Sequence, residues 1–336
     1  MMQKKKLKAG ILKRSSSDLF SQEILDSLGI LDWGYTEESI PHTFEHYKAW
    51  TQNSAGSLNY LKDHRLSLRS DIKKVYPEFQ AALVFLFDYQ SEKKYLLNHD
   101  LHLVAGYSLA YSGEDYHFEI AKRLKTLFDF LNLEDSEFKI SLDIQPILER
   151  DLAFRAGLGW FGKNSMLISR EHGSYFLIGS LLLNQKLDLD KGQISTDHCG
   201  KCTMCIEACP TQAIDPEKRT IKADLCLSTF TIETMHEADA PAGYENSRGE
   251  IFGCDICQDI CPWNHKVLRT KDIEPFMSSK SLHLIEWLQR DPKLIIAELD
   301  MMSKRGVKKF FQGSVFERPG KVGWIKNLKA KLKLKN

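Results

Sequence analysis

Eight cysteines, all between residues 199 and 261, constrain this chain more than any other feature. They form a run C-x2-C-x2-C-x3-C-P, a lone cysteine and a second run C-x2-C-x3-C-P, at positions Cys199, Cys202, Cys205, Cys209, Cys226, Cys254, Cys257 and Cys261. The first run is that of bacterial ferredoxins, whose 4Fe–4S clusters each take four thiolates. Two such clusters would use the whole cysteine inventory of the chain. The spacing therefore predicts a two-cluster domain that carries electrons.

The order of the cysteines also predicts which thiol belongs to which cluster. In the bacterial pattern, the cysteine that precedes proline binds the cluster of the other run. The predicted ligands of cluster 1 are Cys199, Cys202, Cys205 and Cys261, and those of cluster 2 are Cys209, Cys226, Cys254 and Cys257. Structural zinc is an alternative, because C-x2-C pairs also bind zinc, but zinc does not require the longer run. Disulfides are disfavoured, because cysteines this close in sequence are typical of metal ligands in a reducing compartment.

The composition is that of an ordinary globular protein. With 336 residues, of which 43% are hydrophobic and 27% charged, the chain can form about two domains with a sizeable core. A net charge of +1 gives no overall attraction to nucleic acid or membrane. From Lys321 to the end, however, six lysines occur without an acid. This basic tail is either a solvated terminus or a segment that contacts phosphates.

No segment of the sequence resembles a membrane span or an export signal. The first residues are basic, but the apolar stretch at 9–12 is too short for a signal peptide. No apolar run approaches the roughly 18 residues that a spanning helix needs. We therefore expect a cytoplasmic protein without a membrane partner, and we expect a monomer.

Hydrophobic periodicity predicts an alternation of helices and strands before the cysteines. Residues 18–71 are predicted to be mainly helical, and amphipathic helices are predicted at 117–133 and 147–156. Strands are predicted at 81–87, 138–144, 165–169 and 175–183, with Asp143 at the end of the second and a short turn joining the last two. The chain then divides into an α/β domain at 1–190, a ferredoxin-like domain at 191–268, and a short helical segment with the basic tail at 269–336, without helical repeats.

The electron acceptor does not follow from these patterns. No G-x-G-x-x-G follows a strand, so a dinucleotide fold is unsupported, and there is no P-loop. The cobalamin signature D-x-H-x-x-G is nearly met by Asp100, His102 and Gly106, but the glycine comes one residue late and we reject the match. The residues alone thus indicate an iron–sulfur redox protein with an unidentified acceptor.

Longer motifs resemble one family. The segments LDIQPILER at 142–150 and AGLGWFGKNS at 156–165 resemble epoxyqueuosine reductases, as do the DYH triplet at 115–117 and the two cysteine runs with their flanking residues. The resemblance extends over about residues 56–324. It implies an oxidoreductase that uses cobalamin, reduced through the two clusters, to convert epoxyqueuosine to queuosine in the anticodon of tRNA. It also implies a cobalamin-binding α/β domain, related to nitroreductases and reductive dehalogenases, joined to a ferredoxin-like domain.

The same resemblance implies roles for individual residues. Asp143 matches the proposed proton donor of the family. Because an ordinary aspartate has a pKa of about 3.9, we expect Asp143 to be desolvated between cofactor and substrate, so that its pKa rises. The alternative is a helix N-cap ahead of Pro146. The expected cobalamin contacts are Asp143, Asn164, Ser165, Ser228, Cys254, Asp255 and Ile256. The glycines at 157, 159 and 162 either let the backbone approach the corrin or form a tight turn.

The chain departs from the family in two places. Arginines common in the family are absent from the segment at 110–117, and the helical-repeat domain that follows in longer members is missing. Expected partners are tRNA, held through the basic tail and the ferredoxin-like face, and an external low-potential electron donor. Two other functions stay open: a reductive dehalogenase-like enzyme acting on a small molecule, which the lack of an export signal disfavours, and an electron-transfer protein without a catalytic site.

Overall fold

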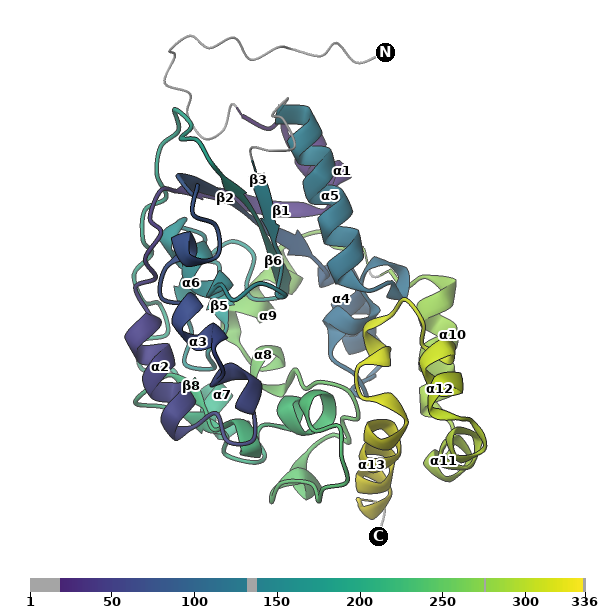
Figure 1. Cartoon of the computed structure of the whole chain (residues 1–336). Coiled ribbons are helices and arrows are strands. Elements are labelled where there is room, and N and C mark those ends of the chain that lie inside the picture. Colours follow the sequence, from purple (N-terminus) through teal and green to yellow (C-terminus); the bar gives the residue numbers. More distant parts are fainter. Residues whose placement is uncertain (1–18, 132–137, 275, 335–336) are drawn as a thin grey trace.

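The computed structural model describes residues 19–131, 138–274 and 276–334. At its centre lies a four-stranded sheet in which all neighbouring strands are antiparallel. Its strands, in spatial order, are β1 (Ile30–Thr36), β2 (Ala81–Asp88), β6 (Phe176–Leu183) and β3 (Phe138–Ser141). Figure 1 shows α5 (Tyr116–Leu131) along one face of this sheet and α6 (Glu149–Arg155) on the opposite side.

The apolar run of β2 is explained by burial on both faces of the sheet. Leu83 and Phe85 point into a core shared with Ile120 of α5. The alternate residues Val84 and Leu86 point to the other face, into a second core shared with α6. Since successive side chains of a strand face opposite sides, a strand covered on both sides reads as continuously hydrophobic. The predictions of a strand at 81–87 and of helices at 117–133 and 147–156 are confirmed within the described residues.

The predicted structure of residues 18–71 was partly wrong. Helices α1 (Gln22–Ser27), α2 (Phe44–Asn53) and α3 (Arg65–Leu68) are present, but β1 lies between the first two. The strand pairs with β2 along its length, with a register shift between Ile30 and Asp32. Its polar and glycine positions hide the strand signal, and its stabilising backbone bonds come from a strand distant in sequence.

Residues 165–169 and 175–183, predicted to be two strands joined by a short turn, both contain strands, but these strands do not pair with each other. β5 (Leu167–Ile168) pairs instead with β4 (Trp160–Phe161), forming a small separate hairpin. β6 runs between β2 and β3, and only a single bridge, Ser169 to Gly173, closes the turn before it. The β4–β5 hairpin is therefore free of the central sheet and packs toward the cysteine region.

The cysteine region is built of short elements. They are α7 (Met204–Glu207), β7 (Ile214–Asp215), β8 (Thr220–Ile221), the π-helical turn η8 (Thr229–Glu233), α8 (Ile256–Asp259) and α9 (Pro262–Thr270). An isolated parallel bridge between Val104 and Phe252 ties this region to the loop after α4 (Gln90–Asn98). Phe252 also belongs to the main hydrophobic core, so the region is continuous with the α/β part.

The C-terminal part is helical, as predicted, but the tail is not a solvated end. It consists of α10 (Ser279–Gln289), α11 (Pro292–Met301), α12 (Lys304–Phe310) and α13 (Gly320–Lys333), of which α13 lies beside the cysteine region in Figure 1. Trp324 of α13 is buried and stacks on Phe252 with ring centroids 5.8 Å apart. Asn327 donates to the carbonyl oxygens of Thr231 and Ile251, at 2.8 Å each.

The lysines of α13 are correspondingly mixed in role. Lys326 is buried, where it donates to the carbonyl oxygen of Phe230 and lies 3.7 Å from the centre of that ring. Lys329 and Lys333 are exposed and face Glu237 and Asp239. Lys335 lies outside the described residues. None of the helices in the described ranges is long and apolar enough to cross a membrane.

Candidate active site and cluster region

Asp143 lies two residues beyond the end of β3, where the chain turns toward α6. Its backbone is left-handed, with φ of 52°, a conformation that aspartate tolerates better than most residues. The Asp143 amide donates to Oε1 of Glu149 at 2.7 Å, and the hydroxyl of Ser141 donates to the same oxygen at 2.9 Å. The N-cap of α6 is Leu148, so the alternative reading of Asp143 as a helix cap is wrong. Glu149 instead fixes the loop that presents Asp143.

The Asp143 carboxylate meets the first turn of α5. The hydroxyl of Tyr116 donates to Oδ2 of Asp143 at 2.8 Å, and Nε2 of His117 lies 3.7 Å from the same oxygen. The other ring nitrogen of His117 is 2.6 Å from Oδ1 of Asp115. The DYH triplet noted in the sequence is thus brought to Asp143, from a helix that is distant in the chain.

Burial and neighbouring groups shift the pKa values of the side chains around Asp143. Surrounding protein partly desolvates Asp143, which raises its pKa, but the nearby imidazole of His117 and the hydrogen bond from Tyr116 outweigh this and hold the pKa below its ordinary value. This lowered pKa belongs to the protein without cofactor and substrate, and a raised pKa of Asp143 when it is desolvated between the two stays a prediction. Burial lowers the pKa of His117, yet bonds to Asp115 and Asp143 raise it overall, to about 9. Burial, together with the Asp143 charge, raises the pKa of Glu149 to about 8.

A third part of the chain faces Asp143. Nη2 of Arg318 lies 2.8 Å from both carboxylate oxygens of Glu233, and the Tyr60 hydroxyl is 3.5 Å from Glu233. The Arg318 charge contributes to lowering the pKa of Asp143. Sequence reasoning missed Arg318 and Tyr60, which lie in no recognisable motif; Glu233 stands in the TIE triplet of the family-like cysteine region.

The Asp143 side chain is open to a large partner. It is 63% exposed, and the neighbours in sequence of Asp143 and His117, Ile144 and Phe118, are exposed apolar side chains. An acid, an imidazole and a phenol next to uncovered apolar surface form a place where a sizeable, partly apolar molecule can reach the carboxylate.

Three of the polar side chains expected to contact cobalamin are engaged within the protein. Asn164 is buried and donates to the carbonyl oxygen of Cys257 at 3.3 Å. The Ser165 hydroxyl donates to the Arg219 carbonyl at 2.7 Å, while Arg150 donates to the carbonyl of Ser165. Asp255 is ion-paired, as described below. Contacts from these residues to a corrin stay predictions, and they would have to come from the backbone or follow rearrangement.

The remaining predicted contacts lie at element starts in the cysteine region. Ser228 immediately precedes η8, and Ile256 begins α8 next to Cys257. Both side chains are partly exposed. The glycine segment at 157–162 packs on protein instead: a Cβ on Gly159 would lie 2.3 Å from the carbonyl oxygen of Ile168. That glycine is needed for the β4–β5 hairpin, which is the tight-turn alternative.

The thiols fall into two neighbourhoods. Burial, and then the nearby thiols of Cys199, Cys261 and Cys202, raise the pKa of Cys205 to about 11. Burial and the thiol of Cys226 head the causes that raise the pKa of Cys257, to which Cys209 and also Cys205 contribute. Burial raises the pKa of Cys254, and the nearby thiols of Cys257 and Cys226 raise it further. In the described residues no group of three His, Cys, Asp or Glu side chains is arranged to hold a single metal ion; a cluster needs only one thiolate for each iron.

The β4–β5 hairpin is fixed to the first cysteine run. Nζ of Lys163 donates to the carbonyl oxygens of Gly200 and Cys202, at 2.8 Å each. Arg219 donates to the carbonyl of Phe161 at 3.0 Å and to the carboxylate of Asp197 at 2.6 Å. Trp160 of β4 packs in one small cluster with Ile168, Cys261, Cys199 and Trp263.

A buried ion pair holds the second cysteine run. Nζ of Lys93, in α4, lies 2.8 Å from Oδ2 of Asp255 and 2.6 Å from Oδ1 of Asp259. Asp255 also accepts from the amide of Gly106 at 2.8 Å. Arg248 completes the network at 2.8 Å from Asp259.

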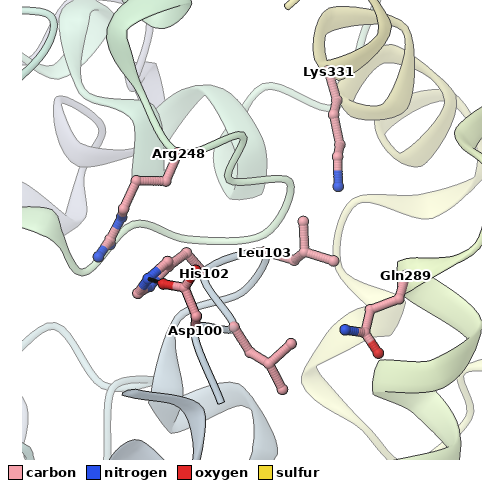
Figure 2. A pocket seen from close by; sticks show the side chains of 7 residues that line it. Asp100, His102, Leu103, Arg248, Gln289 and Lys331 are labelled. Atoms are coloured by element: carbon pink, nitrogen blue, oxygen red, sulfur yellow. Dashed lines mark hydrogen bonds and ion pairs between the residues drawn. The ribbon is translucent and has the colours of Figure 1, made fainter. Parts of the chain in front are cut away.

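A separate cavity of about 520 Å³ lies at the junction of the cysteine region and the C-terminal helices. Figure 2 shows its lining side chains, Asp100, Leu101, His102, Leu103, Arg248, Gln289 and Lys331. The rejected D-x-H-x-x-G segment is found here, where Nε2 of His102 lies 2.8 Å from Oδ1 of Asp100. None of the lining residues belongs to the group around Asp143, so we do not assign the cavity to the active site.

Known families match the chain in two segments. Residues 198–264 match the 4Fe-4S double cluster binding domain, and residues 69–143 match the family described as Epoxyqueuosine reductase QueG, DUF1730. The epoxyqueuosine reductase of Cyclobacterium marinum is 32% identical over 321 residues, which cover 95% of this chain and 94% of that protein. The match to the double-cluster family supports iron–sulfur clusters over zinc.

Solved structures share the fold. An epoxyqueuosine reductase from Streptococcus thermophilus superposes with a TM-score of 0.73 at 22% identity, covering 94% of this chain and 80% of that one. A crystal structure of epoxyqueuosine reductase with an epoxyqueuosine-modified tRNA-Tyr stem loop superposes with a TM-score of 0.68 at 23% identity, covering 92% and 79%. The predicted combination of an α/β part with a double-cluster region is thereby confirmed.

Proposed function

The chain belongs to the epoxyqueuosine reductase family of oxidoreductases, and we propose that it removes the epoxide oxygen of epoxyqueuosine in the anticodon of a tRNA, giving queuosine. Loss of that oxygen as water consumes two electrons and two protons. The observation that carries the proposal is the exposed Asp143 carboxylate, held by Tyr116 and His117, in a chain that also has a double-cluster region.

We assign the electron supply to the eight cysteines in the two sets predicted from their order. The interaction of Cys205 with Cys199, Cys202 and Cys261 supports the first set, in which the cysteine before Pro262 crosses to the other run. The interaction of Cys257 with Cys226 and Cys209 supports the second. Clusters held by these cysteines would supply one-electron redox chemistry, with electrons from an external low-potential donor.

Cobalamin is the group proposed to reduce the epoxide, and it supplies a low-potential cobalt when bound. The exposed apolar side chains of Phe118 and Ile144 beside Asp143 fit one flank of a large ring. Ser228 and Ile256, at the starts of η8 and α8, are the predicted contacts with partly exposed side chains. Asn164, Ser165 and Asp255, also predicted to contact the ring, have side chains that hold the surrounding loops through bonds to protein groups.

Asp143 and His117 together provide one of the two protons that the leaving oxygen needs, and solvent supplies the other. An epoxide oxygen leaves as a poor alkoxide unless it is protonated as the bond breaks. His117 carries a proton at neutral pH, because its pKa is about 9, and its Nε2 faces the Asp143 carboxylate. When substrate displaces water from Asp143, desolvation favours the neutral carboxyl, so a proton can move from His117 to Asp143 and on to the oxygen.

Tyr116 and Glu149 position this acid. Tyr116 donates to the same Asp143 oxygen that faces His117, which orients the carboxylate. Glu149 accepts a hydrogen bond from the amide of Asp143 and so keeps the backbone of Asp143 in its left-handed conformation. Neither residue needs to exchange a proton with substrate in this arrangement.

The direct test is conversion of a defined substrate. The protein, reconstituted anaerobically with iron, sulfide and cobalamin and reduced with dithionite, should convert epoxyqueuosine in a tRNA stem loop to a nucleoside lacking one oxygen, as detected by mass spectrometry. Protein with both clusters and bound cobalamin that leaves the stem loop unchanged would refute the function. Conversion without cobalamin would refute only its role, and turnover of halogenated phenols instead of tRNA would favour the dehalogenase alternative.

A further inference from the structure

Trp160 carries a buried polar group without a partner. Its side chain is 2% exposed, and its indole Nε1 has no hydrogen-bond partner among the described residues. An indole N–H can only donate, and buried donors in native proteins nearly always have an acceptor. The acceptor of Trp160 should therefore be a group that belongs to the working protein.

The surroundings of Trp160 identify what that acceptor is. The ring packs in one cluster with Cys261 and Cys199, both assigned to cluster 1. Two aromatic rings also contact the indole edge to face: Trp263, with ring centroids 5.0 Å apart, and His198, with ring centroids 4.8 Å apart. The sulfurs of cluster 1 are thus the acceptors that the assigned ligands would bring to this indole.

We propose that the indole N–H of Trp160 donates a hydrogen bond to a sulfur of cluster 1, either a cysteine thiolate or an inorganic sulfide, and thereby raises the reduction potential of that cluster. The proposal rests on the assignment of cluster 1 under the proposed function. It makes Trp160 a residue that tunes electron transfer, beyond the packing role expected of a buried tryptophan.

The hairpin that contains Trp160 is anchored by hydrogen bonds, so that the indole has a fixed position. Lys163 anchors the turn of the hairpin to the carbonyl oxygens of Gly200 and Cys202, and Arg219 anchors the strand through the carbonyl of Phe161. These bonds, made one and three residues after Trp160, hold the hairpin against the first cysteine run. A donor fixed in this way needs no reorganisation when the cluster changes charge.

The effect on potential has a definite sign. One-electron reduction adds a negative charge to the cluster, and an N–H donor stabilises the more negative state. Removing the donor should therefore make cluster 1 harder to reduce. Cluster 2 has a different set of thiols and should keep its potential.

The test is a dithionite-poised redox titration, followed by electron paramagnetic resonance, of the reconstituted full-length protein and its variants. Trp160→Phe should disfavour reduction of one cluster about tenfold, which is 59 mV for a one-electron couple, and leave the other titration wave in place. Trp263→Phe is the matched control, since Trp263 is a partly exposed tryptophan in the same hydrophobic group of side chains as Trp160. It should shift neither wave by a comparable amount.

A second measurement keeps the proposal testable if Trp160→Phe does not assemble. Electron–nuclear double resonance on the reduced wild-type protein should show a proton coupled to cluster 1 that exchanges in D2O. Its absence, or a Trp160→Phe protein with two clusters and unchanged potentials, would overturn the role of Trp160. Failure of the wild-type protein to bind two clusters would instead count against the proposed function.

Discussion

Nζ of Lys93 lies 2.8 Å from Oδ2 of Asp255, and this contact joins a helix of the α/β part to the loop between two predicted cluster ligands. Both side chains are almost completely buried. Asp259, one turn further on and next to Ile260 and Cys261, shares the same ammonium group at 2.6 Å. The Lys93 ammonium group thus links α4 to two carboxylates of the second cysteine run.

Replacing Lys93 by methionine should destabilise the protein strongly. The substitution keeps the length of the side chain but leaves buried Asp255 without a cation and Asp259 with Arg248 alone. Breaking a buried pair from one side costs about 3–5 kcal/mol. Lys186→Met is the control, because its exposed pair with Glu37 should contribute only about 0–1 kcal/mol. Urea unfolding of both variants checks this, and equal midpoints would show that Lys93 is not a structural anchor.

Asp143→Asn should lower turnover by about 10²–10⁴, the usual effect of losing a general acid. The amide keeps the size of the side chain and can still accept from Tyr116, but it cannot pass on a carboxylic proton. Single-turnover assays with the modified stem loop measure the loss. Asp100→Asn, which changes an exposed acid at the separate cavity, should behave as wild type. Near-normal turnover of Asp143→Asn would remove Asp143 from the mechanism.

Deprotonation of His117 should lower both activity and stability at basic pH. Its pKa rises from 6.5 to about 9 on folding, so its stabilising contribution is complete below pH about 6.5 and is lost as the pH rises through about 9. The groups that set this pKa are Asp115 and Asp143, while Arg318 acts on both carboxylates. Turnover should fall over the same range, because the protonated imidazole is needed.

The comparison with His117→Gln isolates this effect from Glu149, which titrates near pH 8. The difference in melting temperature between wild type and variant should shrink from pH 6.5 to 9, and the variant should have low turnover at every pH. A difference that stays constant across this range would mean that His117 is not the protonated member of the pair.

Cys261→Ala tests the crossing of ligands between the cysteine runs. If Cys261 binds cluster 1, the variant should lose or damage the cluster of the first run and spare the one held by Cys254 and Cys257. Iron content and spectra of the reduced protein distinguish the two clusters. Selective loss of the second cluster would overturn the assignment.

The contribution of the tail to tRNA binding needs charge changes rather than truncation. Deleting the residues after Asn327 would remove Leu328 and Ala330, which are buried, so the truncated fold is not expected to survive intact. Lys329→Gln with Lys333→Gln removes two exposed charges instead. If both contact phosphates, tRNA affinity should fall and the slope of log K against log salt should become shallower by about 1 per contact. Lys186→Gln is the control, and an unchanged slope would exclude the tail from binding.

The chemistry of the electron path could be predicted from the sequence because its signals are local. Cluster ligation needs fixed short spacings, so the runs ending at Cys209 and Cys261 are diagnostic before any fold is known. Burial on both faces likewise leaves a direct trace in the apolar run of β2. Asp143 was found through a contiguous motif, which also carried its position just after a strand.

Only the tertiary structure decided what surrounds these residues. The protonation of Asp143 depends on Tyr116, His117 and Arg318, which reach it from distant segments, and their donors reversed the shift that desolvation alone would give. Likewise, a lysine-rich tail reads as solvated until α13 packs Trp324 against Phe252 and buries Lys326 over Phe230. The sequence by itself predicted the cysteines as cluster ligands and pointed to Asp143 as the candidate acid. Long-range packing determined their charge states, because desolvation and hydrogen bonding depend on neighbours that no local pattern reveals.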